Sequence, residues 1–214
     1  MTQDNRFREF KEQVSSAEEL EGLIGAPKQM VIDKVQDHLD EVSRAFIKQS
    51  PFLVMASTGV GDYIDLSPKG DPAGFVKILD DHHLAIPDRP GNKRVDTFHN
   101  LLKNPQIGLI FLIPGKTETL RVSGEARLVR DPDLLESMAV KGKAPSLAMV
   151  VHVERAFVHC PKCMIRSGLW NPESWEESSS LPDIGEAMIK QAHLDTTPEE
   201  LFEEAEREGL TKLY

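Results

Sequence analysis

The chain has 214 residues, 40% of them hydrophobic, and its 25 basic and 35 acidic side chains give a formal net charge of −10. This length is enough to bury a hydrophobic core within one domain. The negative charge argues against nucleic acid and anionic membranes as partners, but it is compatible with a local cationic pocket for a small phosphorylated ligand. No apolar run approaches the roughly 20 residues of a membrane span, and the N-terminal residues lack a signal-peptide pattern, so we expect a cytoplasmic protein.

The chain begins with a polar extension over about residues 1–30, in which we identify no chemistry. Apolar residues then recur at spacings of three and four from Ile32 to Phe46, which predicts one amphipathic helix. A strand is predicted over 52–57, a hairpin turn over 58–62 and a second strand from Tyr63. The Pro and Gly residues of 65–72 predict an irregular sheet edge with exposed main-chain groups.

The stretch 84–105 passes from a strand through a Pro- and Gly-containing loop into a short amphipathic helix. Main-chain N–H groups at a helix start, together with guanidinium and amide donors just before it, suit a phosphomonoester dianion. We predict that Arg89, Asn92 and Arg94 bind such a phosphate, with Lys93 as the second choice. The alternative is a solvated basic turn on an acidic protein.

Further strands are predicted over 106–114, 119–128 and 147–160, with a short helix over about 131–139. Gly124 is expected to allow close approach of a neighbouring backbone. Six or more strands with tight turns predict an antiparallel barrel. Residues 176–214 are expected to form an acidic helical appendage, and the whole chain is taken as a single domain.

Two cysteines are too few for a disulfide scaffold. Cys160 and Cys163 have the spacing of zinc ligands, but a structural zinc needs four ligands and the chain has no second cysteine pair, so we predict no metal. No thioredoxin-like alternation of strands and helices surrounds them. A disulfide or a reactive thiol stays open as an alternative.

Four motifs occur in a fixed order: DLSPKGD at 65–71, PGNKR at 90–94 followed by Asp96 and Asn100, FLIPG with ETLRVSG at 111–124, and HCPKCMIRSGLW at 159–170. In this order they resemble the pyridoxamine 5'-phosphate oxidase-like family of FMN-binding split barrels, in particular an uncharacterised branch of it. The resemblance covers about residues 30–175. It implies a mainly β fold, an antiparallel Greek-key split β-barrel with peripheral helices, in a homodimer with FMN at the interface.

The resemblance and the phosphate loop together predict a set of cofactor-binding residues: Ser67, Pro68, Lys69, Gly70, Arg89, Asn92, Lys93, Arg94, Asn100, Arg121, Lys162, Arg166, Ser167 and Trp170. Several have plainer interpretations. Lys69 has the alternative of a solvated hairpin lysine, Asn100 that of a brace of the loop, and Trp170 that of a packing residue. Arg121 is equally consistent with a solvated strand arginine paired with a neighbouring Glu.

The function that the resemblance implies is an oxidoreductase that passes hydride or electrons between FMN and a small-molecule substrate. No catalytic acid or base stands out in the sequence. A non-catalytic flavin-binding or flavin-shuttling protein is the main alternative, and a barrel that uses deazaflavin or haem is another, with His152 or His159 as the axial ligand of haem. True pyridoxamine phosphate oxidase activity is not expected, because an Arg-x-x-Arg-Leu finish is absent.

Overall fold

The computed structural model describes residues 6–59, 61 and 63–214. The chain divides into two compact units, Met1–Val35 and Gln36–Tyr214. The first unit contains α1 (Ala17–Ile24) and α2 (Gln29–Asp33). The hydroxyl of Ser16 caps α1 by accepting the Glu19 main-chain N–H at 3.1 Å. Neither helix has a buried residue, so these short helices have no core of their own.

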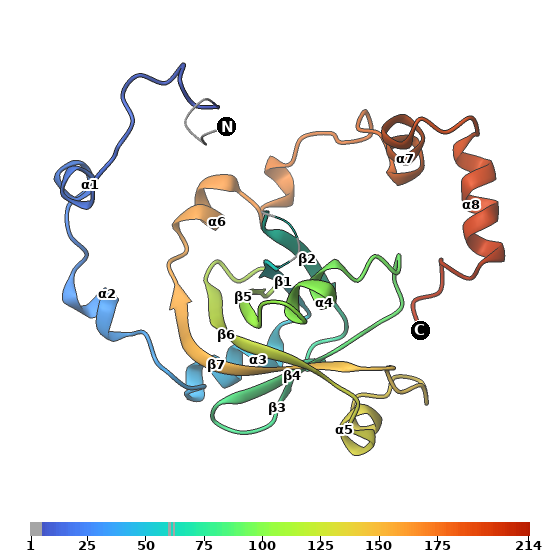
Figure 1. Cartoon of the computed structure of the whole chain (residues 1–214), viewed down its shortest axis with the longest axis horizontal. Helices are drawn as coiled ribbons and strands as arrows, with labels where there is room; N and C mark the ends of the chain where they lie inside the picture. The colour runs from blue at the N-terminus through green and yellow to red at the C-terminus, as the bar shows by residue number, and fades with distance from the viewer. Residues whose placement is uncertain (1–5, 60, 62) are drawn as a thin grey trace. The chain divides into compact units, whose positions relative to one another are not determined.

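The second unit is built on one antiparallel sheet of seven strands in the order β2-β1-β5-β6-β7-β4-β3 (Figure 1). The strands are β1 (Phe52–Ser57), β2 (Asp65–Gly70), β3 (Lys77–Ile78), β4 (His83–Pro87), β5 (Gln106–Leu112), β6 (Thr119–Val129) and β7 (Ala148–His159). The helices are α3 (Glu41–Gln49), α4 (Asp96–Leu101), α5 (Pro132–Ser137), α6 (Lys162–Ser167), α7 (Ile184–Ala192) and α8 (Pro198–Arg207), with a 3₁₀ turn at Pro172–Ser174. The predicted class, a mainly antiparallel β fold with peripheral helices, is confirmed. Among the described residues the pairings leave β2 and β3 as sheet edges.

The two longest strands, β6 and β7, pair along their whole length and join the two halves of the sheet (Figure 1). Their register shifts between Ser123 and Gly124. A Cβ atom added to Gly124 would lie 1.9 Å from the main-chain oxygen of His152. The prediction that Gly124 permits close backbone approach is therefore confirmed.

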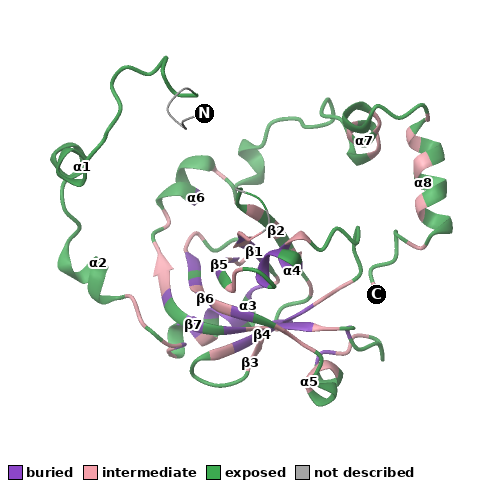
Figure 2. Cartoon of the chain, in the orientation of Figure 1, coloured by how far each residue is buried: buried purple, intermediate pink, exposed green. Residues whose placement is uncertain are grey.

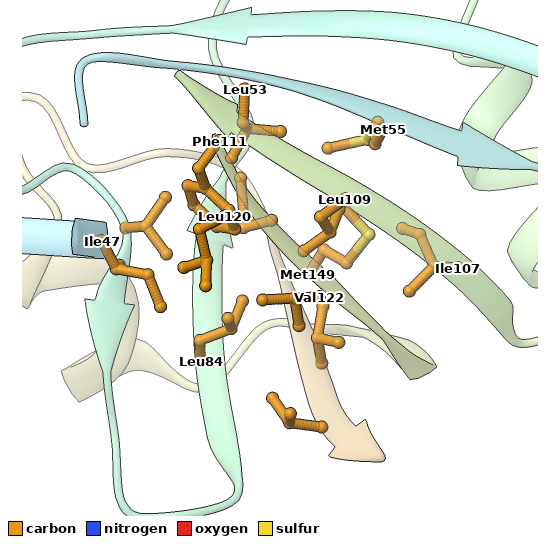
Figure 3. Close-up of a cluster of buried hydrophobic side chains, with 14 of the residues drawn as sticks. Ile47, Leu53, Met55, Leu84, Ile107, Leu109, Phe111, Leu120, Val122 and Met149 are labelled. Atoms are coloured by element: carbon orange, nitrogen blue, oxygen red, sulfur yellow. The ribbon is translucent and has the colours of Figure 1, made fainter. Parts of the chain in front are cut away.

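The core lies on one face of these strands. Residues alternate along β1 and β5 between buried and partly exposed, the period of two expected of a strand. Figure 3 shows side chains from α3 and from strands β1, β4, β5, β6 and β7 meeting in one cluster, and Figure 2 shows burial concentrated on these strands. Its largest fully buried members include Ile47, Leu53, Leu84, Phe111 and Leu120. Burial of each such side chain contributes about 1.5–3 kcal/mol.

The single helix predicted from Ile32 to Phe46 is wrong, because α2 ends at Asp33 and α3 begins at Glu41. Between them, Gln36 exchanges main-chain hydrogen bonds of 3.0 and 2.8 Å with Ala156 of β7. Asp40 then caps α3 by accepting the main-chain N–H of Ser43 at 2.8 Å. A β-bridge and an N-cap interrupt a sequence whose apolar spacing alone predicts a continuous helix.

The irregular edge predicted over 65–72 is also wrong for most of its length. Asp65–Gly70 is a regular six-residue strand paired with β1. Pro68 is accommodated because β2 lies at the edge of the sheet and needs no hydrogen bond on its outer side. In the hairpin turn that precedes this strand, residues 60 and 62 lie outside the described residues.

No helix in the described ranges is long and apolar enough to span a bilayer. Both cysteines, Cys160 and Cys163, are exposed thiols without a disulfide.

Candidate functional site

A cavity of about 530 Å³ lies between β2, the loop that follows β4, the start of α4 and a segment after α8. It is lined by Asp65–Lys69, Asp88–Phe98 and Glu208–Leu210. The cavity brings together seven of the predicted cofactor-binding residues, namely Ser67, Pro68, Lys69, Arg89, Asn92, Lys93 and Arg94. Two stretches that are separate in the sequence therefore form one site.

Strand β2 forms one wall of the cavity. Ser67 and Lys69 are half-buried and alternate with exposed neighbours, as the two-residue period of a strand requires. The Lys69 ammonium lies 5.9 Å from the centroid of the Phe98 ring. Burial raises the pKa of the nearby Asp88 carboxyl, and the charge of Lys69 partly opposes that rise. Lys69 has no ion-pair partner among the described residues, so its charge is available to a ligand.

Arg89 occupies the base of the loop and is bound by the protein itself. Its Nε donates to Asp71 Oδ2 at 2.6 Å, and a terminal nitrogen donates to the Met138 main-chain oxygen at 3.0 Å. The side chains of Arg89 and Asp71 are only 17% and 2% exposed. This buried ion pair anchors the loop to the end of β2, and it leaves Arg89 fewer free donors than the sequence interpretation assumed.

The tip of the loop presents donors to the cavity. The Asn92 side-chain oxygen accepts the main-chain N–H of Arg94 at 3.1 Å, and Arg94 Nε donates to Asp96 Oδ2 at 2.7 Å. Within the described residues, the two terminal nitrogens of Arg94 have no protein acceptor, and Lys93 has no ion-pair partner. A guanidinium held by one edge can still bind an anion with the other.

The same tip has an unusual backbone. Lys93 and Val95 have φ values of 60° and 50°, in the left-handed region that a β-branched residue rarely adopts. Such a conformation costs of order 1–3 kcal/mol and persists only where the surroundings impose it. The strain therefore lies next to the exposed donors of Arg94.

Helix α4 holds the loop against the sheet through polar contacts. The Thr97 hydroxyl donates to Asp65 Oδ2 at 3.0 Å, and the buried Asn100 amide donates to the Ser57 hydroxyl at 3.1 Å. Asn100 does not line the cavity. Its position matches the alternative interpretation, in which it braces the loop.

The segment after α8 reaches the cavity and is fastened beside it. The Tyr214 hydroxyl donates to Asp71 Oδ1 at 2.6 Å, and Lys143 Nζ donates to the Tyr214 main-chain oxygen at 3.2 Å. The hydrogen bond to Asp71 is the main cause of a raised pKa at the Tyr214 phenol. The aromatic ring lies 5.9 Å from the Arg89 guanidinium carbon. Sequence reasoning missed this contact because 143 residues separate its partners.

The side chains that line the cavity carry no net positive charge. Four cationic side chains line it, and so do four carboxylates, those of Asp65, Asp88, Asp96 and Glu208. Recognition of an anion here therefore depends on directed donors and not on net charge.

The remaining predicted residues do not line this cavity: Gly70, Asn100, Arg121, Lys162, Arg166, Ser167 and Trp170. Arg121 is exposed on β6, opposite Phe157 of β7. The predicted residues of α6, Lys162, Arg166 and Ser167, are exposed. The Ser167 hydroxyl donates to the Met164 main-chain oxygen at 3.1 Å. Trp170 is partly buried, and its indole N–H donates to the Lys116 main-chain oxygen at 2.8 Å.

The two histidines considered as haem ligands also lie outside the cavity lining. His152 is exposed in the middle of β7, and His159 ends that strand opposite Thr119 of β6.

Comparison with known proteins identifies the family to which the chain belongs. A family model described as pyridoxamine 5'-phosphate oxidase matches residues 39–160, more than half of the chain. The chain belongs to the pyridoxamine 5'-phosphate oxidase family. The matched segment contains all seven strands and every part of the cavity except Glu208–Leu210. No curated protein matches the chain.

Several solved structures are similar to part of this family member. HupZ of Group A Streptococcus is 18% identical, with 56% of this chain and 92% of that chain covered and a TM-score of 0.45. A candidate pyridoxamine 5'-phosphate oxidase from Lactobacillus delbrueckii is 19% identical, with coverages of 57% and 95% and a TM-score of 0.44. An FMN-binding protein from Syntrophomonas wolfei is 9% identical, with coverages of 56% and 89% and a TM-score of 0.40.

Proposed function

We propose that this family member binds FMN in the cavity between β2 and the 88–95 loop and acts as a flavin-dependent oxidoreductase on a small-molecule substrate. One observation carries the proposal: the chain folds so that Lys69 of β2 and the donors of Lys93 and Arg94 face the same 530 Å³ cavity. Both stretches lie within the segment matched by the family model.

The residues of the cavity fit the proposed cofactor. Its volume falls within the range of about 300–1,000 Å³ usual for sites that bind small molecules and cofactors. The terminal nitrogens of Arg94 and the ammonium of Lys93 can donate to a phosphate at the loop tip. Ser67 and Lys69 lie along β2, where they can contact the ribityl chain or the edge of the flavin ring.

When bound, FMN supplies the capacity to accept and give hydride or electrons. In this proposal the chain's own residues bind and orient the cofactor and set the local electrostatics. Arg94 and Lys93 hold the phosphate, and the buried pair of Arg89 and Asp71 keeps their loop in place. The ammonium of the half-buried Lys69 would stabilise negative charge on a ligand beside β2.

We further propose that two copies of the chain form a homodimer at β2. This strand is a sheet edge, and an exposed edge readily pairs with or packs against another chain. Ile64, just before this strand, and Leu66, within it, are 69% and 66% exposed, and Leu66 lines the cavity. A second copy placed there would bury these side chains. It would also bring its own Arg166 and Trp170, two of the cofactor-binding residues that the resemblance predicts, to the outer side of the cavity.

An absorbance spectrum of the purified protein, followed by titration with FMN, tests the cofactor. Flavin absorption bands and saturable binding are expected, and turnover can then be screened with a hydride donor such as reduced pyridine nucleotide together with an electron acceptor. A protein that binds FMN tightly but turns over no donor or acceptor would favour flavin shuttling instead. A Soret band, or a colourless protein that ignores FMN, would overturn the proposal.

Light scattering during size-exclusion chromatography tests the dimer. Leu66→Glu is expected to shift the protein toward the monomer, whereas Leu181→Glu, at an exposed leucine outside the cavity lining, is expected to leave the dimer intact. A wild-type protein that is monomeric with FMN bound would contradict this part of the proposal.

A further inference from the structure

Four of the seven histidines meet on a surface away from the proposed cofactor cavity. They are His38 before α3, His82 and His83 at the start of β4, and His152 on β7. Ring centroids are 6.1 Å apart for His38 and His82, 5.9 Å for His82 and His152, and 4.9 Å for His83 and His152. The fold creates this cluster because β4 pairs with β7 so that His83 lies opposite His152.

Asp80 fixes the orientation of the His83 ring. Its carboxylate accepts the main-chain N–H groups of His82 and His83 at 2.7 and 2.8 Å, and it lies 2.9 Å from His83 Nδ1. A carboxylate at Nδ1 favours a proton on that nitrogen and leaves Nε2 with its lone pair free.

The free nitrogen of His83 faces another imidazole nitrogen. His83 Nε2 lies 3.2 Å from Nδ1 of His152. Two imidazole nitrogens bound to one tetrahedral metal ion at about 2.0–2.1 Å are separated by roughly 3.3 Å. The two rings therefore already have nearly the separation that a shared metal ion requires.

The surroundings repeat the pattern that supports metal-bound histidines. In such residues the N–H of the second ring nitrogen usually donates a hydrogen bond to a carboxylate or a main-chain oxygen. His83 has the Asp80 carboxylate in this position, and His82 Nδ1 lies 3.2 Å from the main-chain oxygen of Asp37. The ring of His82 is thus held in the same way, with Nε2 as its remaining nitrogen.

We propose that His83 and His152 chelate a divalent transition-metal ion of the class that prefers imidazole, such as Zn²⁺, Ni²⁺ or Cu²⁺. Among the described residues, no three His, Cys, Asp or Glu side chains are arranged to hold a metal ion together. The pair is therefore an open site, in which water completes the coordination. The neighbouring His82 can replace a water only by giving up its contact with the Asp37 main-chain oxygen and rotating its ring. Neither chelating residue lines the cofactor cavity, so the proposal does not depend on FMN.

The test is calorimetric titration of the full-length, tag-free protein with Zn²⁺ alone, with Cu²⁺ and electron paramagnetic resonance as a second probe. One equivalent of metal is expected, and the Cu²⁺ spectrum should show coupling to two or three nitrogens. His83→Gln and His152→Gln should each abolish this binding. Asp80→Asn should weaken it about 10–100-fold, the usual effect of removing a carboxylate that orients a metal-bound histidine.

His193→Asn is the matched control, because His193 is exposed at the end of α7 with φ of 54° and Asn tolerates that conformation. It should bind metal like the wild type. Thermal melts with and without Zn²⁺ separate loss of metal from loss of fold, since metal raises the melting temperature only of variants that bind it. Absence of wild-type binding, unchanged binding in both His→Gln variants, or equal loss in the His193 control would overturn the proposal, leaving a hydrogen bond between two rings.

Discussion

Replacing Gly124 with Ala tests the closest backbone contact in the sheet. The added Cβ would lie 1.9 Å from the His152 main-chain oxygen and 3.0 Å from the main-chain nitrogen of Glu154. Strands β6 and β7 would have to separate by more than about 1 Å to restore ordinary contact, at the point where their register shifts. Overpacking a well-packed interior costs about 1–3 kcal/mol, and backbone atoms cannot move aside as a flexible side chain does, so we expect about 3 kcal/mol.

Gly108→Ala provides the control, because its added Cβ would meet only the Ala56 Cβ at 4.0 Å in the neighbouring strand pair. In a protein of this size, about 3 kcal/mol corresponds to a fall in melting temperature of roughly 6–12 °C. Calorimetry and urea denaturation of both variants measure the difference. If Gly124→Ala unfolds within about 1 kcal/mol of Gly108→Ala, the close contact described for β6 and β7 is incorrect.

Three further predictions concern groups around the cavity. In a Tyr63→Phe background, alkaline absorbance titration should show Tyr214 ionising above the ordinary tyrosine range, and Asp71→Asn should lower its pKa, since the Asp71 hydrogen bond is the main cause of the rise. The stabilisation from that bond is present below the ordinary tyrosine pKa and is lost as the pH rises through the folded pKa. Burial raises the pKa of Asp88, so ionisation of this carboxyl opposes folding, and the free energy of unfolding should fall as the pH rises through the folded pKa. In urea denaturation, Asp88→Asn should remove this fall. The same variant should bind FMN severalfold more tightly, because it removes a carboxylate from the cavity lining. Val95→Gly should raise the free energy of unfolding by about 1 kcal/mol, because glycine adopts a φ of 50° without the backbone strain of valine. An unchanged urea midpoint would argue against strain at this position.

Local sequence patterns predict much of this fold. Apolar runs of strand length predict β1, β5 and β7, and the clean two-residue alternation of 119–128 predicts β6, because burial on one face of a sheet imposes that period. The same reasoning fails before α3, where the spacing from Ile32 to Phe46 fits one helix. The break there depends on a bridge between Gln36 and Ala156, a pairing across 120 positions that no local pattern reports.

Local sequence motifs likewise predict part of the candidate site, but not the contacts between residues far apart in the chain. Lys69 and the tip residues Lys93 and Arg94 follow from two short motifs, and the structure brings them to one cavity. The sequence does not reveal that Asp71 engages Arg89, because an arginine in a loop fits ligand binding and internal pairing equally well. The histidine cluster is likewise invisible, since it depends on the register between β4 and β7.

The most direct test of the account compares the dissociation constants of FMN and riboflavin for the wild type and for Arg94→Ala. The two ligands differ only in the phosphate, so their affinity ratio isolates the contribution of the loop tip. We predict that the wild type prefers FMN, and that Arg94→Ala loses about tenfold or more in FMN affinity, the usual effect of removing a charge-assisted contact, while riboflavin binding is unchanged. Arg130→Ala, at an exposed arginine outside the cavity, should retain the wild-type ratio. Equal affinity of the wild type for both ligands, or an Arg94 variant that keeps the full preference, would contradict the assignment of this cavity to FMN.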